Sequence, residues 1–494
     1  MRPERLEAGR TARVAFEFDG RRIEAFAGET VATALLAAGV DALRRSARRG
    51  EPRGVFCDMG VCFECLVYRE GQAVRACMEP VREGMRLTSF GPELDADSRV
   101  VSDPQPPQPV ETLRAQVVVV GGGPAGMAAA DELARAGIAV LVLDEGPRLG
   151  GQIFRQTPTE FAAVEPAPHG APSHAAGHRL IAAVQGAPAI AVRSGVTVWD
   201  IQPRRLSASC AGRGLVVEAE HVILAVGAMD RPVPFPGWTL PGVVTAGAAQ
   251  VMVRGQRLGP GRRAVVAGTG PLLLPTVTAL RSAGVSIAGL LEANPAVALL
   301  RMLPALTGSA RRREALHYVG QLAAQGIRMR FGHAVFAARG ADRLESVVVG
   351  RVDAEGYPIA GSEHEVEADV LCTGFGLLPA VELAVLAGCA MHHQELRGGW
   401  LPRHDACMAT SVPGVWVAGE IAGIGGAEVA IAEGRLAGRA VAVALGATDT
   451  GLRALQQARA RERAASDALL GAFPVLPGLF ELAEPGTIVC RCED

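Results

Sequence analysis

Four cysteines near the N-terminus have a spacing that constrains both the local fold and the chemistry of this chain. They follow the pattern Cys57-x4-Cys62-x2-Cys65-x11-Cys77. The first three lie on one short loop with Gly60, a residue free to adopt the backbone angles that turn amide groups toward a bound group. Thiolates at these intervals suit two bridged irons, a [2Fe-2S] cluster. Structural zinc is the alternative, but zinc sites favour paired C-x2-C knuckles, and this spacing fits them poorly.

The residues around these cysteines predict a β-grasp ferredoxin-like domain over residues 1–100. Apolar and polar residues alternate over 13–26 around Asp19-Gly20, which indicates a β-hairpin. A short helix is expected over 30–38 and a second hairpin over 66–75. The proline-rich stretch that follows predicts an extended linker over 101–112.

A glycine-rich turn after the linker predicts a dinucleotide site. A buried strand expected over 116–120 leads into Gly121-Gly122-Gly123-Pro124-Ala125-Gly126 and then into a helix over 127–136. Dinucleotide binding needs this order, because the helix N-terminus faces the pyrophosphate. The next strand ends at Asp144-Glu145, where an acidic side chain can accept from the ribose hydroxyls. We expect this site to hold FAD, with further contributions from Gly150, Gly151, Gln152, Gly227, Gly419 and Glu420.

The dinucleotide pattern recurs further along the chain. A strand expected over 264–266 precedes Gly268-Thr269-Gly270, and a strand expected over 285–291 is followed by Glu292. Leu273, however, stands where a third glycine normally permits close contact between helix and strand. Two interpretations stay open: an NAD(P) site on Gly268, Gly270 and Glu292, or a retained scaffold that binds weakly or not at all.

These elements predict an α/β protein with two dinucleotide-binding domains after the ferredoxin-like domain, as in flavoproteins of the pyridine nucleotide-disulfide reductase type. The FAD-binding domain is expected over 113–258 and 365–465, with an NAD(P)-binding-like domain inserted over 259–364. Buried strands over 221–227 and 369–374 are expected in the FAD-binding domain, where the chain enters and leaves the insertion.

The C-terminal tail, expected over 466–494, ends in Cys490-Arg491-Cys492. A C-x-C pair needs two more ligands to hold an iron-sulfur cluster, and none follow. We interpret Cys490 and Cys492 as the opening of a second cluster domain that this sequence does not contain.

Composition excludes several function classes. All 49 basic residues are Arg, so there is no Schiff-base or general-base lysine. The net charge of −2, with both signs interspersed, argues against a nucleic-acid or membrane-surface partner. No apolar run is long enough for a membrane span, no signal peptide is evident and the cysteines suit a reducing compartment, so we expect a cytoplasmic protein without direct membrane insertion.

Other cysteines and histidines carry little information. Disulfide-reductase chemistry is excluded, because no redox-type cysteine pair follows Gly151, and four cysteines are isolated: Cys210, Cys372, Cys389 and Cys407. His392, His393 and His404 are assigned no role. The arginines at 44, 45, 48, 49 and 53 are expected to favour the reduced cluster or to dock an acidic partner, or else to form a solvated helix end.

The whole combination resembles the cluster- and flavin-containing subunits of bacterial hydrogen cyanide synthase, opine oxidase and D-hydroxyproline dehydrogenase, with kinship to the alpha subunit of heterotetrameric sarcosine oxidase. The most specific stretches are residues 48–57, 143–152, 236–247 and 489–492. The resemblance implies an FAD-dependent oxidoreductase that acts on CH-NH or CH-NH2 donors beside a second FAD-dependent catalytic subunit, similar to amino-acid oxidases. It leaves the substrate and the electron acceptor unknown.

Two unlike redox centres in one chain suggest three functions. FAD takes up two electrons and a two-iron cluster carries one, so the first hypothesis is an electron-transfer subunit of an amino-acid or amine (opine, imino acid or glycine-type) dehydrogenase or oxidase. The second is an NAD(P)H-dependent FAD/iron-sulfur reductase that acts alone, with Glu292 favouring NAD. The third is a redox-sensing protein that binds its cofactors without turnover.

Overall fold

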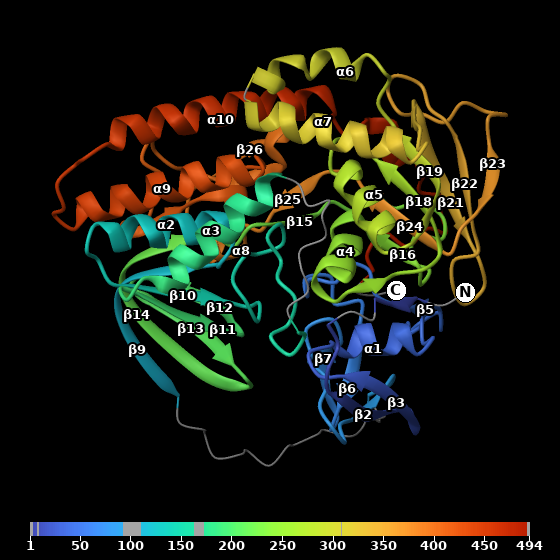
Figure 1. Cartoon of the computed structure of the whole chain (residues 1–494), viewed down its shortest axis with the longest axis horizontal. Helices are drawn as coiled ribbons and strands as arrows, with labels where there is room; N and C mark the ends of the chain where they lie inside the picture. Colours follow the sequence, from blue (N-terminus) through green and yellow to red (C-terminus); the bar gives the residue numbers. More distant parts are fainter. Residues whose placement is uncertain (1–2, 7–8, 92–109, 163–171, 308, 492–494) are drawn as a thin grey trace.

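The computed structural model describes residues 3–6, 9–91, 110–162, 172–307 and 309–491, and residues 101–109 of the expected linker lie outside these ranges. The described chain forms an N-terminal domain and two further bodies, each built on its own central sheet (Figure 1). The predicted α/β class is confirmed. None of the described helices is long and apolar enough to cross a membrane.

The N-terminal domain is a five-stranded sheet with one short helix packed on it. The sheet order is β3-β2-β8-β6-β7. The predicted hairpins are present, the first turning at Asp19 and Gly20, where φ is 49° and 75°. The elements are β2 (Arg13–Phe18), β3 (Arg21–Phe26), α1 (Val31–Ala37), β6 (Leu66–Arg69), β7 (Gln72–Arg75) and β8 (Arg86–Thr88).

Two small strand pairs tie this domain together and to the rest of the chain. β1 (Glu4–Arg5) pairs with β17 (Leu258–Gly259), far along the sequence. β4 (Arg44–Arg45) pairs with β5 (Pro52–Arg53), so residues 44–53 form a hairpin. The expected alternative of a solvated helix end for these arginines is therefore wrong.

The first nucleotide-binding sheet has the order β11-β10-β9-β14-β13-β12, with one more strand on β14. Residues 117–120 of β9 are almost completely buried, as expected for a parallel strand covered on both faces. β9 begins several residues before the predicted strand because its first half pairs with β14. The strands are β9 (Glu111–Val120), β10 (Val140–Asp144), β11 (Ile190–Ser194), β12 (Val196–Gln202), β13 (Arg205–Cys210), β14 (Arg213–Leu224) and β28 (Val415–Val417).

Helices α2 (Pro124–Arg135) and α9 (Ala427–Ala444) cross closely beside this sheet, with α10 (Leu452–Ala472) next to α9 and α3 (Pro172–Gly186) next to α2 (Figure 1). The backbones of α2 and α9 nearly touch. A Cβ added at Gly434 would lie 2.1 Å from the Ala125 carbonyl oxygen, and one at Gly438 would lie 2.6 Å from that of Ala129. Glycine at both positions is therefore needed to hold the start of α2 in place.

The second nucleotide-binding sheet is parallel and has the order β16-β24-β18-β19-β20. It extends beyond the expected insertion of 259–364 on both sides, because β16 and β24 pair with each other and β24 pairs with β18. The strand predicted over 369–374 thus lies in this sheet and not in the FAD-binding domain. The strands are β16 (Val243–Thr245), β18 (Arg263–Gly268), β19 (Ser286–Glu292), β20 (Met329–Phe331) and β24 (Val370–Gly374).

The chain crosses between the two nucleotide-binding bodies through β15 (Ala228–Asp230) and β25 (Leu377–Pro379), which pair with each other. The N-terminal domain lies beneath the second body (Figure 1). Remaining elements are α4 (Ala246–Gln250), α5 (Leu273–Ser282), α6 (Ala298–Arg301), α7 (Ser309–Ala324), α8 (Glu382–Leu386), β21 (His333–Arg339), β22 (Ser346–Arg351), β23 (His364–Glu367), β26 (Met391–Gln394) and β27 (Gly399–Pro402).

The α2–α9 contact yields a prediction for stability. Gly434→Ala should lower the free energy of unfolding by at least about 2 kcal/mol, because a methyl group there meets backbone that cannot move aside. Gly320→Ala on α7 is the matched control, since a Cβ there meets nothing within 4 Å, and it should be neutral or slightly stabilising. Denaturant unfolding of both variants measures the difference, and equal stabilities would contradict the proposed backbone contact.

Candidate functional site

The four predicted cluster ligands lie together at the loop between β5 and β6 and the turn after β7. The Cys57 thiol is hydrogen-bonded to Cys62, and Cys65 to Cys77, so the thiols form two close pairs. Two irons with two thiolates each require such an arrangement. Among the described residues, no three His, Cys, Asp or Glu side chains converge as a single metal ion requires. The two close thiol pairs fit the [2Fe-2S] cluster that the cysteine spacing predicts.

The backbone of the cysteine loop is shaped to stabilise thiolates. Asp58, Gly60 and Phe63 have φ of 47°, 82° and 56°, which gives the loop its tight turns. A hydrogen bond with Cys62, together with backbone N–H groups of residues 59, 61 and 62, lowers the pKa of Cys57 to about 6, although burial opposes this. A thiol with a lowered pKa is a ready metal ligand.

A buried charge network supports this loop. The Glu64 side chain is fully buried and lies 3.4 Å from Arg53, 3.5 Å from Arg44 and 3.3 Å from Arg491. The Arg491 guanidinium carbon lies 4.0 Å from the centre of the Phe56 ring. Three guanidinium groups surround one carboxylate, so this network carries excess positive charge close to Cys62. A negative charge on Cys62 also attracts Arg491.

The position of Arg491 was not predicted from the sequence. In the sequence it stands between Cys490 and Cys492, a pair that we expected to begin a second cluster domain that this sequence does not contain. In the structure Arg491 is buried, donates to the Trp238 carbonyl and joins the tail to the cysteine loop. Cys490 is exposed and Cys492 lies outside the described residues, so the interpretation of this pair as the opening of an absent cluster domain stays a prediction.

The glycine turn predicted for FAD has the geometry that the cofactor needs. A Cβ at Gly121 would lie 2.3 Å from the Ala225 carbonyl oxygen, and one at Gly126 would lie 1.8 Å from that of Gly121. No side chain fits at either position, so glycine keeps the turn tight and the helix close to the strand, as a dinucleotide-binding turn requires. The N–H of Gly150 donates to the Gly122 carbonyl oxygen at 2.9 Å, which brings the 150–152 segment against the turn.

The two acidic residues after β10 have partners in the protein. The N–H groups of Gly122 and Gly146 donate to the Asp144 carboxylate, the latter at 2.6 Å, so Asp144 braces the turn itself. Glu145 accepts from the Arg75 guanidinium at 2.8 Å and from the Thr197 hydroxyl at 3.0 Å. The assignment of Asp144 and Glu145 to the ribose hydroxyls stays a prediction. Each carboxylate would have to bind the ribose while it keeps the protein contacts described above.

The loop after β28 completes the predicted FAD site. A Cβ at Gly419 would lie 2.7 Å from the Ala125 Cβ, so this loop packs on the glycine turn. The Glu420 carboxylate accepts from the N–H groups of Gly425 at 2.9 Å and Gly426 at 2.7 Å, just before α9 begins. Gly123 and Pro124 start α2, Gln152 is exposed, and Gly227 lies where β14 leads into β15.

Two arginines, Arg75 and Arg155, lie between the cysteine loop and the predicted FAD site, and the sequence did not single them out. Arg75 donates to the Gly60 carbonyl oxygen at 2.6 Å and to Glu145 at 2.8 Å, and so joins the two sites. Burial lowers the pKa of Arg155. The negative charges of Asp58, Asp144 and Cys77, which lie near it, oppose this lowering. No sequence pattern could identify these contacts, because they join separate domains.

The second glycine motif is occupied by the chain itself. Glu292 is 1% exposed and accepts from the N–H of Gly270 at 2.7 Å and the side-chain amide of Asn294 at 2.9 Å. The same amide donates to the Pro474 carbonyl oxygen at 3.2 Å, and a Cβ at Gly270 would lie 3.5 Å from that of Phe473. The segment after α10 therefore covers the place where a nicotinamide dinucleotide would bind.

The chain is similar to known protein families and to subunits of known enzymes. The family model for pyridine nucleotide-disulphide oxidoreductases matches residues 115–434, and that for 2Fe-2S iron-sulfur cluster binding domains matches residues 11–90. The opine oxidase A-subunit of Rhizobium meliloti (strain 1021) is 32% identical over 384 residues, 76% of this chain and 82% of that protein. The HcnB subunit of hydrogen cyanide synthase from Pseudomonas aeruginosa is 34% identical over 392 residues, which are 76% of this chain and 82% of that protein.

Two further similarities are more distant. The sarcosine oxidase alpha subunit of Corynebacterium sp. (strain P-1) is 27% identical over 466 residues, which are 87% of this chain and 43% of that protein. The crystal structure of L-proline dehydrogenase from P. horikoshii has a TM-score of 0.65 at 21% identity, covering 93% of this chain and 79% of that one. This last similarity shows a shared fold.

The buried network around Glu64 predicts how one arginine affects the cysteine loop. Arg491→Gln should lower the free energy of unfolding by about 3 kcal/mol, because it removes one partner of a buried carboxylate. It should also make the midpoint potential of the cluster more negative, because positive charge near the cluster stabilises the reduced form.

The control for this prediction is Arg86→Gln, which removes an exposed pair with Glu17 at 3.8 Å. It should change stability by less than about 0.5 kcal/mol and leave the potential unchanged. An unaltered potential in an Arg491→Gln protein that retains its cluster would contradict the electrostatic role of this residue.

Proposed function

The chain belongs to the pyridine nucleotide-disulphide oxidoreductase family, and we propose that it is an electron-transfer subunit of an amino-acid or amine dehydrogenase or oxidase. The opine oxidase A-subunit and the HcnB subunit of hydrogen cyanide synthase are among its relatives. The chain is an FAD-dependent oxidoreductase with FAD and a [2Fe-2S] cluster as cofactors. The predicted resemblance to opine oxidase, hydrogen cyanide synthase and sarcosine oxidase subunits is confirmed.

The observation that carries the proposal is the direct contact between the two cofactor sites. Arg75 binds Gly60 of the cysteine loop with one nitrogen and Glu145 beside the predicted FAD site with another. FAD takes up electrons in pairs and a [2Fe-2S] cluster carries them singly. The protein's part is to hold the two sites at a fixed separation, which Arg75 does through these two contacts.

The charges of the site suit an electron-accepting role for the loop. Buried guanidinium groups of Arg53 and Arg491 face Glu64, and the loop buries Cys57, Cys65 and Cys77 away from water. The attraction between positive charge beside the site and an added electron is stronger where water is excluded, because the low dielectric screens it less. The arginines predicted to favour the reduced cluster include two members of this network, Arg44 and Arg53.

The covered second glycine motif favours the relay over a reductase that takes hydride from NAD(P)H by itself. Binding a nicotinamide dinucleotide at Gly268 and Gly270 would require displacement of Phe473 and Pro474 and release of Glu292 from its buried contacts. Electrons would then reach the FAD from another protein. The relatives are named as subunits, which supports a partner chain.

We infer that the partner is a second FAD-dependent catalytic subunit, similar to amino-acid oxidases, that removes a hydride equivalent from a carbon–nitrogen bond. The substrate class would be an opine, an imino acid or a glycine-type amino acid, in line with the names of the relatives. The final acceptor is a separate question, to be answered with the assembled complex.

The test is anaerobic reduction with and without the partner. The chain is purified alone and together with a candidate partner flavoprotein, and flavin absorbance is followed after addition of NADH or of an opine, an imino acid or an N-methyl amino acid. The proposal predicts no bleaching by NADH and bleaching by one substrate only when the partner is present. Rapid bleaching of the isolated chain by NADH would establish the self-sufficient reductase instead.

The bridge at Arg75 gives a second prediction. Arg75→Gln should slow electron equilibration between flavin and cluster at least about tenfold, because a loosened loop increases the separation of the two sites, while each cofactor stays bound. Laser-flash photoreduction of the flavin followed at cluster wavelengths measures the rate, with Arg86→Gln as control. An unchanged rate would contradict the role of Arg75, and no equilibration in the native chain would favour a redox sensor without turnover.

A further inference from the structure

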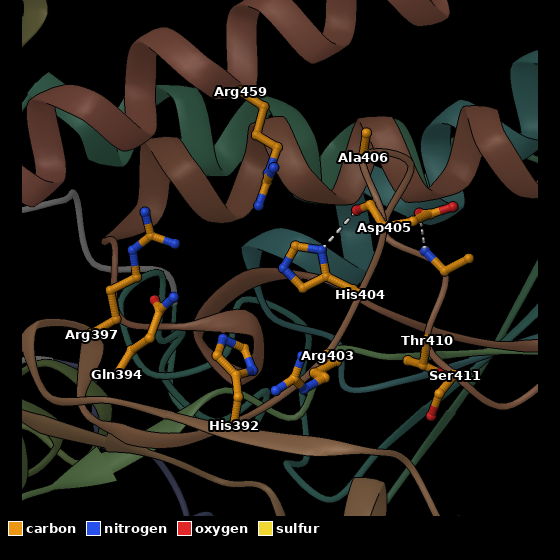
Figure 2. A pocket seen from close by; sticks show the side chains of 11 residues that line it. His392, Gln394, Arg397, Arg403, His404, Asp405, Ala406, Thr410, Ser411 and Arg459 are labelled. Atoms are coloured by element: carbon orange, nitrogen blue, oxygen red, sulfur yellow. Dashed lines mark hydrogen bonds between the residues drawn. The ribbon is translucent and has the colours of Figure 1, made fainter.

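An open cleft of about 760 Å³ lies between the β26–β27 hairpin, the loop over residues 403–411 and α10, and most of its lining residues are polar or charged. None of the residues predicted to hold FAD or the cluster lines it. Figure 2 shows His392, Arg397, Arg403, His404 and Arg459 arranged around one open space. The sequence alone indicates no role for His392 or His404. The residues come from separate segments of the chain, and only the fold brings them together.

The cations that line the cleft have few anionic partners. Arg403 donates only one long hydrogen bond of 3.4 Å, to the Met391 carbonyl oxygen, and the described residues place no carboxylate within ion-pairing distance of it. Arg459 shares the Glu433 carboxylate with Arg463, at 3.0 Å and 2.6 Å. Among these, only Arg397 has a carboxylate to itself, Asp467.

The carboxylate in the lining is turned away from the cleft. Asp405 accepts from the backbone N–H groups of Cys407 at 2.8 Å and Ala409 at 2.9 Å, and so closes its own loop. The buried Nδ1 of His392 has no hydrogen-bond partner within the described protein. A buried polar atom without a partner is costly. Because His392 also lines the cleft, it would contact a bound group through its other ring nitrogen, Nε2.

We propose that this cleft binds a small dianion that carries carboxylate or phosphate groups. One acidic group is held by Arg403, where a guanidinium can donate two parallel hydrogen bonds to an oxyanion. The second is held by Arg459, on the opposite wall formed by α10 (Figure 2). His392 donates to or accepts from the ligand between them.

The cleft is connected to the FAD site through Glu433. One oxygen of its carboxylate pairs with Arg459 at 3.0 Å, and the other accepts from the N–H of Gly419 at 3.1 Å. Gly419 begins the loop that packs on the glycine turn at Ala125. An anion that draws Arg459 toward itself weakens its hold on Glu433 and so alters the surroundings of the flavin.

The binding test uses isothermal titration calorimetry on the full FAD-loaded chain, with succinate and with inorganic phosphate at ionic strength matched by chloride. We expect saturable binding of at least one of them, and the comparison shows which acidic group the cleft prefers. Arg403→Gln should weaken it at least about tenfold. The matched control, Arg205→Gln, changes an exposed arginine on β13 and should leave binding unchanged.

Two outcomes would overturn the site: no saturable binding of either anion, or equal affinities for the Arg403→Gln and Arg205→Gln proteins. His392→Asn gives a second check, because the loss of the imidazole should weaken binding without changing the charge of the cleft. The link through Glu433 is measured separately, as a shift of the flavin absorption on titration. Binding without any shift would refute that link.

Discussion

The buried carboxylate of Glu64 is the interaction on which the arrangement of this protein depends. It lies inside the cysteine loop and is surrounded by Arg44, Arg53 and Arg491, which come from the β4–β5 hairpin and from the C-terminal tail. Removing a charge from water costs several kcal/mol unless partners compensate, so the folded loop depends on the arginines that the hairpin and the tail supply. Three of the four cysteines, Cys57, Cys65 and Cys77, are buried at the loop that these arginines support.

This arrangement explains how one chain can join two unlike cofactors. Arg75 and Arg155 lie at the boundary where the cysteine loop meets the predicted FAD site. The loop also packs against the second nucleotide-binding body, where the Thr245 N–H donates to the Phe56 carbonyl oxygen at 2.9 Å. The second body in turn has its glycine motif covered by the segment after α10. A domain with the geometry of a nucleotide site thus serves as a support for the cluster loop and the tail.

Local patterns in the sequence predicted the α/β fold, the hairpins of the N-terminal domain and both glycine turns, because each depends on neighbouring residues. The spacing of the cysteines likewise predicted that the four thiols lie together. The sequence could not reveal contacts between distant segments: Arg491 against Phe56, Arg75 against Glu145, or Phe473 over Gly270. The strand over 369–374 was assigned to the wrong sheet for the same reason, since buried parallel strands look alike until their partners are known.

The central claim is that the flavin and the cluster of one chain exchange electrons directly. Electron paramagnetic resonance of the anaerobically purified chain, recorded after photoreduction of its flavin, tests this claim most directly. The account predicts the signal of a reduced [2Fe-2S] cluster in the isolated chain, without any partner. A bleached flavin beside a cluster that stays silent, or zinc in place of iron at Cys57, Cys62, Cys65 and Cys77, would contradict it.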